Sequence, residues 1–260
     1  MKNQYIELYE QYRPLIREHS ADVMNNARDI AFEDFKRLGI PSKKIERYKY
    51  TDMKKLFEPD YGLNLKRLDI PVNPYNAFRC DVPNLSTSLY FVVNDAFYAK
   101  NSPKAQLPEG VIIGSLKEVA ENNPELVGMY YAKLAKTSDD GITALNTMLA
   151  QDGLLVYVPK NVRVERAVQV INILRSDVDL MVNRRVLIVV EKGAEIKLLF
   201  CDHAADDRHF LATQVIEAFV EENASLDLYC MEETHEKNVR VSNLKKKKKA
   251  NSRVNHNIIT

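Results

Sequence analysis

The residues best suited to chemistry gather in one short polar segment near residue 200. Cys201, His203 and His209 lie within nine residues of one another, and aspartates stand between them. Thiolate and imidazole groups are common protein ligands of soft and borderline metal ions, so this segment is the candidate metal site. The competing interpretation is a solvated loop between two strands, with the Cys201 thiol as a small packing group. The spacing alone favours the loop.

The other potentially reactive side chains are isolated. Cys80 and Cys230 belong to no CxxC pair, and His235 and His256 have no obvious neighbouring ligand in the sequence. Cys230 follows two leucines at period two, which predicts an inward-facing packing role. The chain has no nucleophile-elbow, zinc-protease or Walker A motif, so we assign no catalytic residue. Three well-separated cysteines also argue against a disulfide framework.

The charge and hydropathy of the chain restrict the classes of binding partner and the cellular compartment that we expect for it. The formal net charge is +1, which gives no whole-molecule attraction to nucleic acid or to an anionic membrane. The one strongly basic feature is the run Lys245–Lys249. The N-terminus lacks the apolar core of a signal peptide, and no stretch approaches the roughly 18 apolar residues that span a bilayer. We therefore expect a cytoplasmic protein in a reducing compartment.

The pattern of apolar and polar residues predicts a helical and mixed α+β region over residues 1–150. Apolar residues at three- and four-residue steps predict helices from Lys2 to about Leu38, with a break at Pro14. Residues 41–83 look irregular, and Leu89–Tyr98 predicts two strands joined by a turn at Asn94-Asp95. The remaining predicted elements are a strand at 111–113 and helices at 115–121, 124–136 and 142–150.

From residue 151 to 260 the chain consists almost entirely of short β-type runs, and these runs repeat. Asn161, Gly193, Asn223 and Asn251 occupy the same slot between two runs, at spacings of 32, 30 and 28 residues. Asn and Gly tolerate positive φ, which suits them to a tight turn at this slot. A strand–turn–strand unit of this period is typical of a β-solenoid with one coil per repeat. The sequence therefore predicts a mainly β fold, a right-handed parallel β-helix preceded by the helical and mixed region.

The last repeat departs from the earlier ones. The sequence stops within a coil, which predicts either a C-terminally truncated fragment or an end that another subunit covers. In the repeat alignment Lys246 and Lys248 fall where Ala218 and Val220 stand one coil earlier. Two ammonium groups in an aliphatic core would be prohibitively costly without partners. The lysine run therefore either loops out of the coil or does not represent the natural residues.

Three segments resemble a known family in the right order. The motif Glu46-Arg47-Tyr48-Lys49-Tyr50-Thr51 is similar to the E-x-(W/Y)-K-Y-T motif near the start of SufD proteins. Residues 145–159 resemble the junction at which the β-helix of SufB and SufD proteins begins, and residues 234–244 and 250–260 look like SufD core. The resemblance covers nearly the whole chain, although the run Lys245–Lys249 departs from the mixed polar and apolar strand of the family.

This resemblance implies a function in SUF iron–sulfur cluster assembly. A SufD-like chain would be a non-catalytic scaffold subunit that pairs with a SufB-like protein through the β-helix and acts with a SufC-like ATPase. It would have no intrinsic cofactor, and an iron–sulfur cluster and a reduced flavin would belong to the full complex. The family's SufC-binding helices and its C-terminal histidine, proposed as a cluster ligand, lie beyond residue 260. We therefore carry no cofactor-binding residue over to this chain.

Other functions stay open at this point. A β-helix carbohydrate-active enzyme would need acidic side chains stacked across successive coils. The positions equivalent to Glu191 are Pro159 and Glu221, which gives no such stack. A metal-binding protein would use the 201–209 segment. A homodimer through the β-helix is a further assembly that the sequence leaves open.

Overall fold

The computed structural model describes residues 2–77, 88–100, 107–234 and 236–259. The sequence-based inferences on Cys80 and His235 therefore concern residues outside these ranges. Within these ranges no helix combines the length and the apolar character needed to cross a lipid bilayer.

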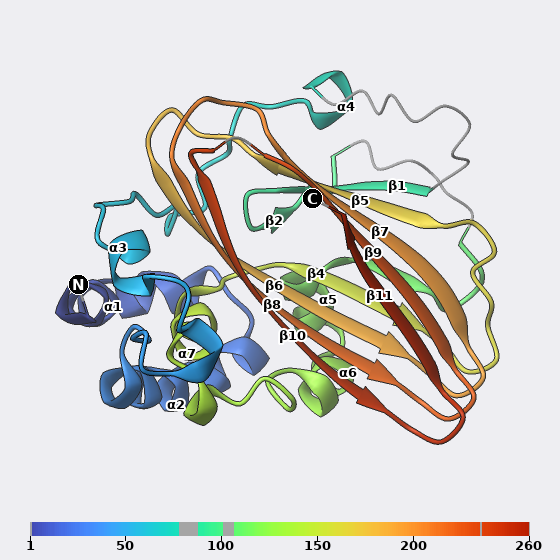
Figure 1. Ribbon diagram of the computed structural model, residues 1–260. Helices are drawn as coiled ribbons and strands as arrows, with labels where there is room; N and C mark the ends of the chain where they lie inside the picture. The colour runs from blue at the N-terminus through green and yellow to red at the C-terminus, as the bar shows by residue number, and fades with distance from the viewer. Residues whose placement is uncertain (1, 78–87, 101–106, 235, 260) are drawn as a thin grey trace.

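Two mostly parallel sheets wind together into a β-solenoid (Figure 1). One sheet has the order β11-β9-β7-β5-β1-β2 and the other the order β10-β8-β6-β4-β3. From β4 onward the chain alternates between the sheets, and among the strands of the described residues only the pairs β1–β2 and β3–β4 are antiparallel. The strands are β1 (Ser88–Val93), β2 (Ala96–Phe97), β3 (Ile112–Ser115), β4 (Leu154–Val158), β5 (Val168–Leu174), β6 (Leu180–Val190), β7 (Glu195–Ala204), β8 (Phe210–Val220), β9 (Ser225–Glu233), β10 (Asn238–Lys248) and β11 (Arg253–Ile259). The predicted mainly β solenoid, preceded by a helical region, is confirmed.

The repeated turn slot adopts the backbone conformation that its residue types predict. The φ angles of Asn161, Gly193, Asn223 and Asn251 are 61°, 69°, 59° and 55°. The turns also stack along the solenoid, because the amide of Asn161 donates to the carbonyl of Lys192 at 2.9 Å. One backbone geometry is thus copied from coil to coil.

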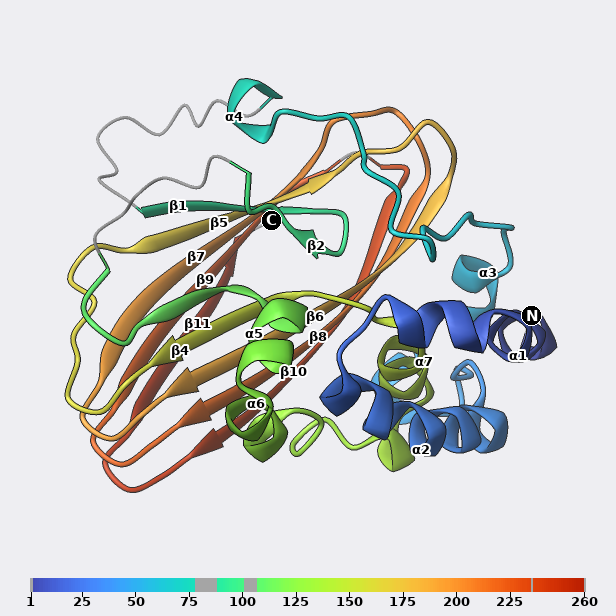
Figure 2. The same cartoon turned by 180° about the vertical axis from the view of Figure 1, so that it is seen from behind.

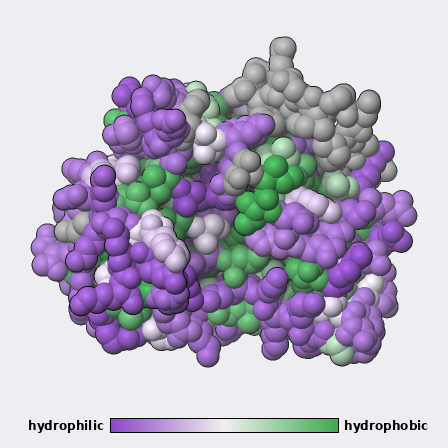
Figure 3. Space-filling model, viewed as in Figure 1, coloured by the Kyte–Doolittle hydropathy of each residue, from purple (hydrophilic) through white to green (hydrophobic). Residues whose placement is uncertain are grey.

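Aliphatic side chains fill one end of each coil. The inward-facing positions that follow the turns are all buried in a single core cluster, and they are Val164, Ile196, Leu198, Phe200, Leu226, Leu228 and Cys230. Figure 3 shows that hydrophilic residues cover much of one outer face, with hydrophobic residues in separate patches. The solenoid therefore holds its main apolar core inside the coils.

Most helices lie against the outer face of the sheet that contains β4, β6, β8 and β10 (Figure 2). The short helix α4 lies instead beside the other sheet, where Tyr75 packs on Phe91 of β1. Helix α7 crosses β6 and β8, and α2 packs on α7. The helical elements are α1 (Lys2–Glu18), α2 (Asp22–Leu38), η1 (Glu46–Tyr48), α3 (Met53–Phe57), α4 (Pro74–Ala77), α5 (Leu116–Asn122), α6 (Pro124–Tyr130), η2 (Thr137–Asp139) and α7 (Gly141–Leu149).

The predicted break at Pro14 is wrong, because α1 continues through it to Glu18. Proline removes one backbone donor and crowds the carbonyl four residues earlier. Both Pro14 and Glu10, whose carbonyl loses this partner, are exposed, so water can satisfy that oxygen. The hydrogen bond lost at Pro14 therefore costs little, and the packing of the buried face of α1 keeps the helix continuous.

The predicted helix at 124–136 is also too long, because α6 ends at Tyr130. Beyond it, the backbone amides of Ala132, Leu134 and Ala135 donate to the carboxylate of Glu217 at 2.9, 2.8 and 3.0 Å. These amides turn toward the sheet instead of continuing a helix. A long-range partner overrides the local helical pattern here.

Glu217 belongs to a buried ion pair that fastens the helical region to the sheet. Its carboxylate lies 2.7 Å from Nη2 of Arg185, and the two side chains are 1% and 0% exposed. Arg185 also donates to Oγ1 of Thr147 in α7 at 2.8 Å, and its guanidinium lies over the ring of Tyr131. Sheet, helix α7 and the segment after α6 thus meet at one pair of charges.

The lysine run does not loop out of the coil, so that interpretation is wrong. Strand β10 continues to Lys248, with Lys246 paired with Ala218 and Lys248 with Val220, in the register of the repeat alignment. Both lysines are exposed, because within the described residues β10 has a paired strand on one side only. The ammonium groups reach solvent, and the burial cost does not arise.

Candidate functional site

The three predicted metal ligands lie in different surroundings. Cys201 is buried on the outward face of β7, beside Ile171 of β5. His203 Nδ1 lies 3.4 Å from the carboxylate of Glu233, and burial lowers the pKa of this histidine. His209 is exposed in the loop before β8. Among the described residues no three His, Cys, Asp or Glu side chains form a group that could hold a metal ion, and metal binding here stays a prediction.

Asp202 is the member of this segment that points into the solenoid. Side chains alternate between the two faces of a strand, so Asp202 faces inward while its neighbours face outward. Only 3% of the residue is exposed. One carboxylate oxygen accepts a hydrogen bond from Arg184, and the other accepts one from Arg240 at 2.8 Å.

Asp202 is part of a polar layer inside the coils. In one sheet Asn172, Asp202 and Glu232 are direct neighbours across β5, β7 and β9. The facing sheet contributes Arg184, Gln214 and Ser242 from β6, β8 and β10. Both sets recur at spacings of 30 or 28 residues, the period already seen in the turns. Extending the repeat alignment to every inward position would have revealed this layer from the sequence.

Positive and negative side chains alternate in the polar layer. Arg240 contacts Glu232 as well as Asp202, so two guanidinium groups face two carboxylates. Burial lowers the pKa of Arg184, and the charge of Asp202 opposes this effect. Buried charges persist when they are paired and hydrogen-bonded. The layer therefore joins neighbouring coils through ion pairs where the apolar core ends.

Cys230 and His256 lie beside the polar layer on β9 and β11. The thiol Sγ is 3.8 Å from Nε2 of His256. Burial raises the pKa of Cys230 to about 11, and burial lowers that of His256, with Lys246 and Arg240 acting in the same direction. The thiol is therefore protonated near neutral pH and is a poor nucleophile. The predicted inward packing role of Cys230 is confirmed.

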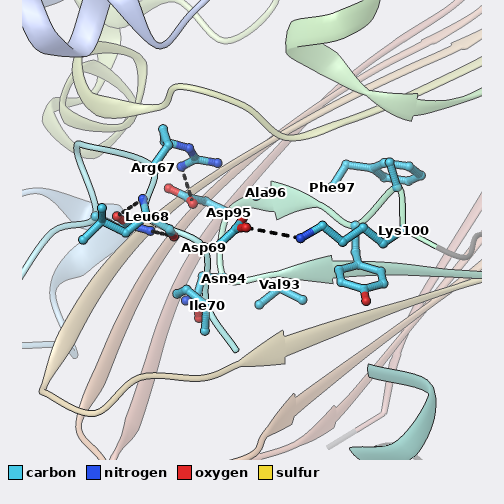
Figure 4. Close-up of a pocket in the computed structure, with 13 residues that line it drawn as sticks. Arg67, Leu68, Asp69, Ile70, Val93, Asn94, Asp95, Ala96, Phe97 and Lys100 are labelled. Carbon is cyan, nitrogen blue, oxygen red and sulfur yellow. Dashed lines mark hydrogen bonds and ion pairs between the residues drawn. The ribbon is translucent and has the colours of Figure 1, made fainter. Parts of the chain in front are cut away.

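A pocket of about 230 Å³ lies between residues 64–70 and the β1–β2 hairpin (Figure 4). Arg67 Nη1 is 2.6 Å from the carboxylate of Asp95, and Lys100 pairs with Asp69 at 3.2 Å. Burial opposes the charge of Arg67, but Asp95 and Asp152 outweigh it and raise the pKa of this arginine. Both ion pairs point across the pocket and bridge its two walls.

The pocket connects to the polar layer through the hairpin turn. Nε of Arg184 donates to the carbonyl of Asn94 at 2.7 Å, and Asn94 lines the pocket. The carboxylate of Asp152 contacts the hairpin at β2, where it accepts a hydrogen bond from the amide of Phe97 at 3.1 Å, and it accepts another from Oγ of Ser115 at 2.7 Å. The lining combines paired charges with the aromatic side chains of Phe97 and Tyr98. Only one feature of this pocket is predicted from the sequence, namely the turn at Asn94.

Comparison with known proteins identifies two consecutive matching regions. Residues 1–170 match the family described as SufBD protein N-terminal region, and residues 172–260 match the SUF system FeS cluster assembly, SufBD core domain. The second match coincides with most of the solenoid, and the first contains the helices and the pocket.

Curated relatives agree with this assignment. An iron–sulfur cluster assembly SufBD family protein of Arabidopsis thaliana is 27% identical over 161 residues, which are 62% of this chain and 33% of the relative. A family protein of Synechocystis is 29% identical over 119 residues, 45% of this chain and 25% of the relative. The iron–sulfur cluster assembly protein SufD of Bacillus subtilis is 34% identical over 118 residues, 45% of this chain and 26% of the relative.

The aligned part of this chain spans a third or less of the length of each of these relatives. The two family matches, by contrast, together cover almost every residue of the chain and follow the order of its fold. The chain belongs to the SufBD family of the SUF iron–sulfur cluster assembly system.

Proposed function

We propose that this chain acts as a SufD-type scaffold subunit in SUF iron–sulfur cluster assembly, together with a SufB-like protein and a SufC-like ATPase. The observation that carries the proposal is the match of the SufBD core domain to residues 172–260, where the chain forms stacked solenoid coils. The relative of Bacillus subtilis that bears the name SufD supports the choice of subunit.

The scaffold role is proposed to be non-catalytic. Energy would come from ATP hydrolysis by the SufC-like partner, and the iron–sulfur cluster would be the cargo of the complex. A reduced flavin would bind at the level of the complex as well. The paired charges of the polar layer favour this role, because Asp202 already has two arginine partners and serves to hold coils together.

Co-purification tests the proposal. The full-length natural protein is expressed with the SufB-like and SufC-like proteins of the same organism, with an affinity tag on this subunit only. Size-exclusion chromatography with light scattering should give one complex that contains all three proteins. Omitting the SufB-like protein should remove the solenoid-mediated pairing, and a homodimer of this subunit would then appear as twice its mass. A tagged protein that retains neither partner would refute the proposal.

A further inference from the structure

One aromatic side chain stands apart from all other described rings. Tyr50 is 91% exposed, whereas no other described Tyr or Phe exceeds 38%. The ammonium group of Lys49 lies 4.9 Å from the centroid of its ring. Tyr48, two residues earlier, is by contrast 7% exposed. Exposed rings beside cations are frequent anchors of protein–protein interfaces.

Residues 43–55, which we call the basic turn, concentrate positive charge around Tyr50. They contain six cations and two carboxylates, a net charge of +4, against +1 for the whole chain. The cations are Lys43, Lys44, Arg47, Lys49, Lys54 and Lys55. Three of them face a carboxylate within 4 Å, namely Asp52, Asp140 or Glu46. Within the described structure Lys44, Lys54 and Lys55 have no ion-pair partner.

The basic turn is held in a fixed shape by buried contacts beneath it. The hydroxyl of Tyr48 donates to Oδ1 of Asp140 at 2.8 Å. Met53 and Phe57 are 2% and 0% exposed and belong to the core of the helical region. The exposed side chains are therefore displayed on a preorganised frame, which reduces the entropy lost when a partner binds.

An apolar hollow borders the same surface. A pocket of about 470 Å³ has an apolar wall of Leu38, Pro41 and Ile45. Its charged lining residues are Glu46, Arg47, Asp139 and Asp140, of which Glu46 pairs with Lys49 and Asp140 with Arg47. Ile45 is 49% exposed at its edge. The basic turn thus carries an aromatic anchor and three unpaired ammonium groups, and it borders a recess for an apolar side chain.

We infer that the basic turn and its hollow form a docking site for an acidic segment of a partner protein that also carries an apolar side chain. Carboxylates of this segment would pair with Lys44, Lys54 and Lys55, while its apolar side chain fills the hollow beside Ile45. Nucleic acid fits less well, because single-stranded binding surfaces offer successive aromatic rings and this one exposes a single ring. The inference does not depend on the proposed scaffold function.

Site-specific photo-crosslinking tests this docking site. Tyr50 of the full chain is replaced by the photoreactive amino acid p-benzoylphenylalanine in its native host, and crosslinked peptides are identified by mass spectrometry. We expect the crosslinks to concentrate in one net-negative segment of one protein. Changing Lys44, Lys54 and Lys55 together to glutamate should lower the yield at least about tenfold, while changing them to arginine should preserve it.

Two controls make the outcome decisive. The same photoreactive group at Ile30 of α2, which is 66% exposed, should not crosslink to that segment. Reversing the mapped carboxylates of the partner to lysine should restore crosslinking to the triple glutamate variant. The inference is overturned if position 50 crosslinks only to RNA or lipid, gives the same scattered products as position 30, or is insensitive to the charge reversal. Circular dichroism of each variant verifies that these exposed substitutions leave the fold intact.

Discussion

Replacing Glu217 by alanine should destabilise the protein more than any surface substitution. The carboxylate is 1% exposed and accepts hydrogen bonds from three backbone amides and from Arg185. Removing one member of a buried ion pair costs about 3–5 kcal/mol, because the remaining charge is left without compensation. Since single domains are stable by about 5–15 kcal/mol, this loss is a large fraction of the total.

Urea unfolding at neutral pH measures this effect, and two variants serve as controls. Glu222→Ala removes an exposed carboxylate that pairs with Lys192, and it should leave the free energy of unfolding nearly unchanged, because solvent screens exposed ion pairs. The double substitution Arg185→Met with Glu217→Leu removes both charges and should recover much of the loss. A change below about 1 kcal/mol for Glu217→Ala would refute the reasoning.

Glu217 should also make the free energy of unfolding depend on pH. Burial alone would raise the pKa of Glu217, but Arg185 and the amides of Ala135 and Leu134 outweigh it and lower the pKa. A carboxylate whose pKa is lower in the folded state stabilises the protein above its unfolded value of about 4.3, and this contribution is lost as the pH falls through the folded pKa. Acidification below about pH 4 should therefore destabilise the wild type more than Glu217→Gln. Equal slopes of unfolding free energy against pH would contradict this.

Three further substitutions or probes test other parts of the structure. Gly193→Ala should lower the unfolding free energy by about 1–3 kcal/mol in urea titrations, since φ is 69° and an added Cβ would lie 2.5 Å from Oδ1 of Asn161. Tyr48→Phe should lower the free energy of unfolding by about 1–2 kcal/mol, because the buried carboxylate of Asp140 loses one hydrogen-bond donor. Tyr50→Phe should leave the stability nearly unchanged, because the Tyr50 side chain is exposed. Thermal unfolding of both variants measures the difference. Cys230 should resist alkylation at pH 8 until the protein unfolds, because burial raises the pKa of its thiol to about 11. Residue-resolved mass spectrometry measures the extent of alkylation. Rapid alkylation of Cys230 in the folded protein would disprove the prediction.

The features that could be predicted from the sequence are those encoded locally and then repeated. The turn residues Asn161, Gly193, Asn223 and Asn251 each need positive φ, and their period revealed the coil length before any contact was known. The strands at Leu89–Tyr98 and the start of α7 near Ile142 were likewise visible, because short-range patterning decides them.

The features that escaped prediction depend on partners far apart in the chain. Helix α6 stops at Tyr130 because Glu217 lies 87 residues later in the sequence and captures the following amides. The ion pair of Arg67 and Asp95 needs an irregular segment to meet a hairpin, which no periodicity describes. In the segment 201–209 the residue types predict a role for Cys201, His203 and His209, but the buried ion pairs are made by Asp202.

The most direct test of the scaffold role is the iron–sulfur cluster content of the assembled complex. SufB-like and SufC-like proteins of the same organism are purified anaerobically with and without the full-length natural form of this subunit, and iron, sulfide and visible absorption are measured per complex. We expect a clear loss of bound cluster when this subunit is left out, and recovery of the cluster when it is added back. Equal cluster content with and without the subunit would contradict the central claim.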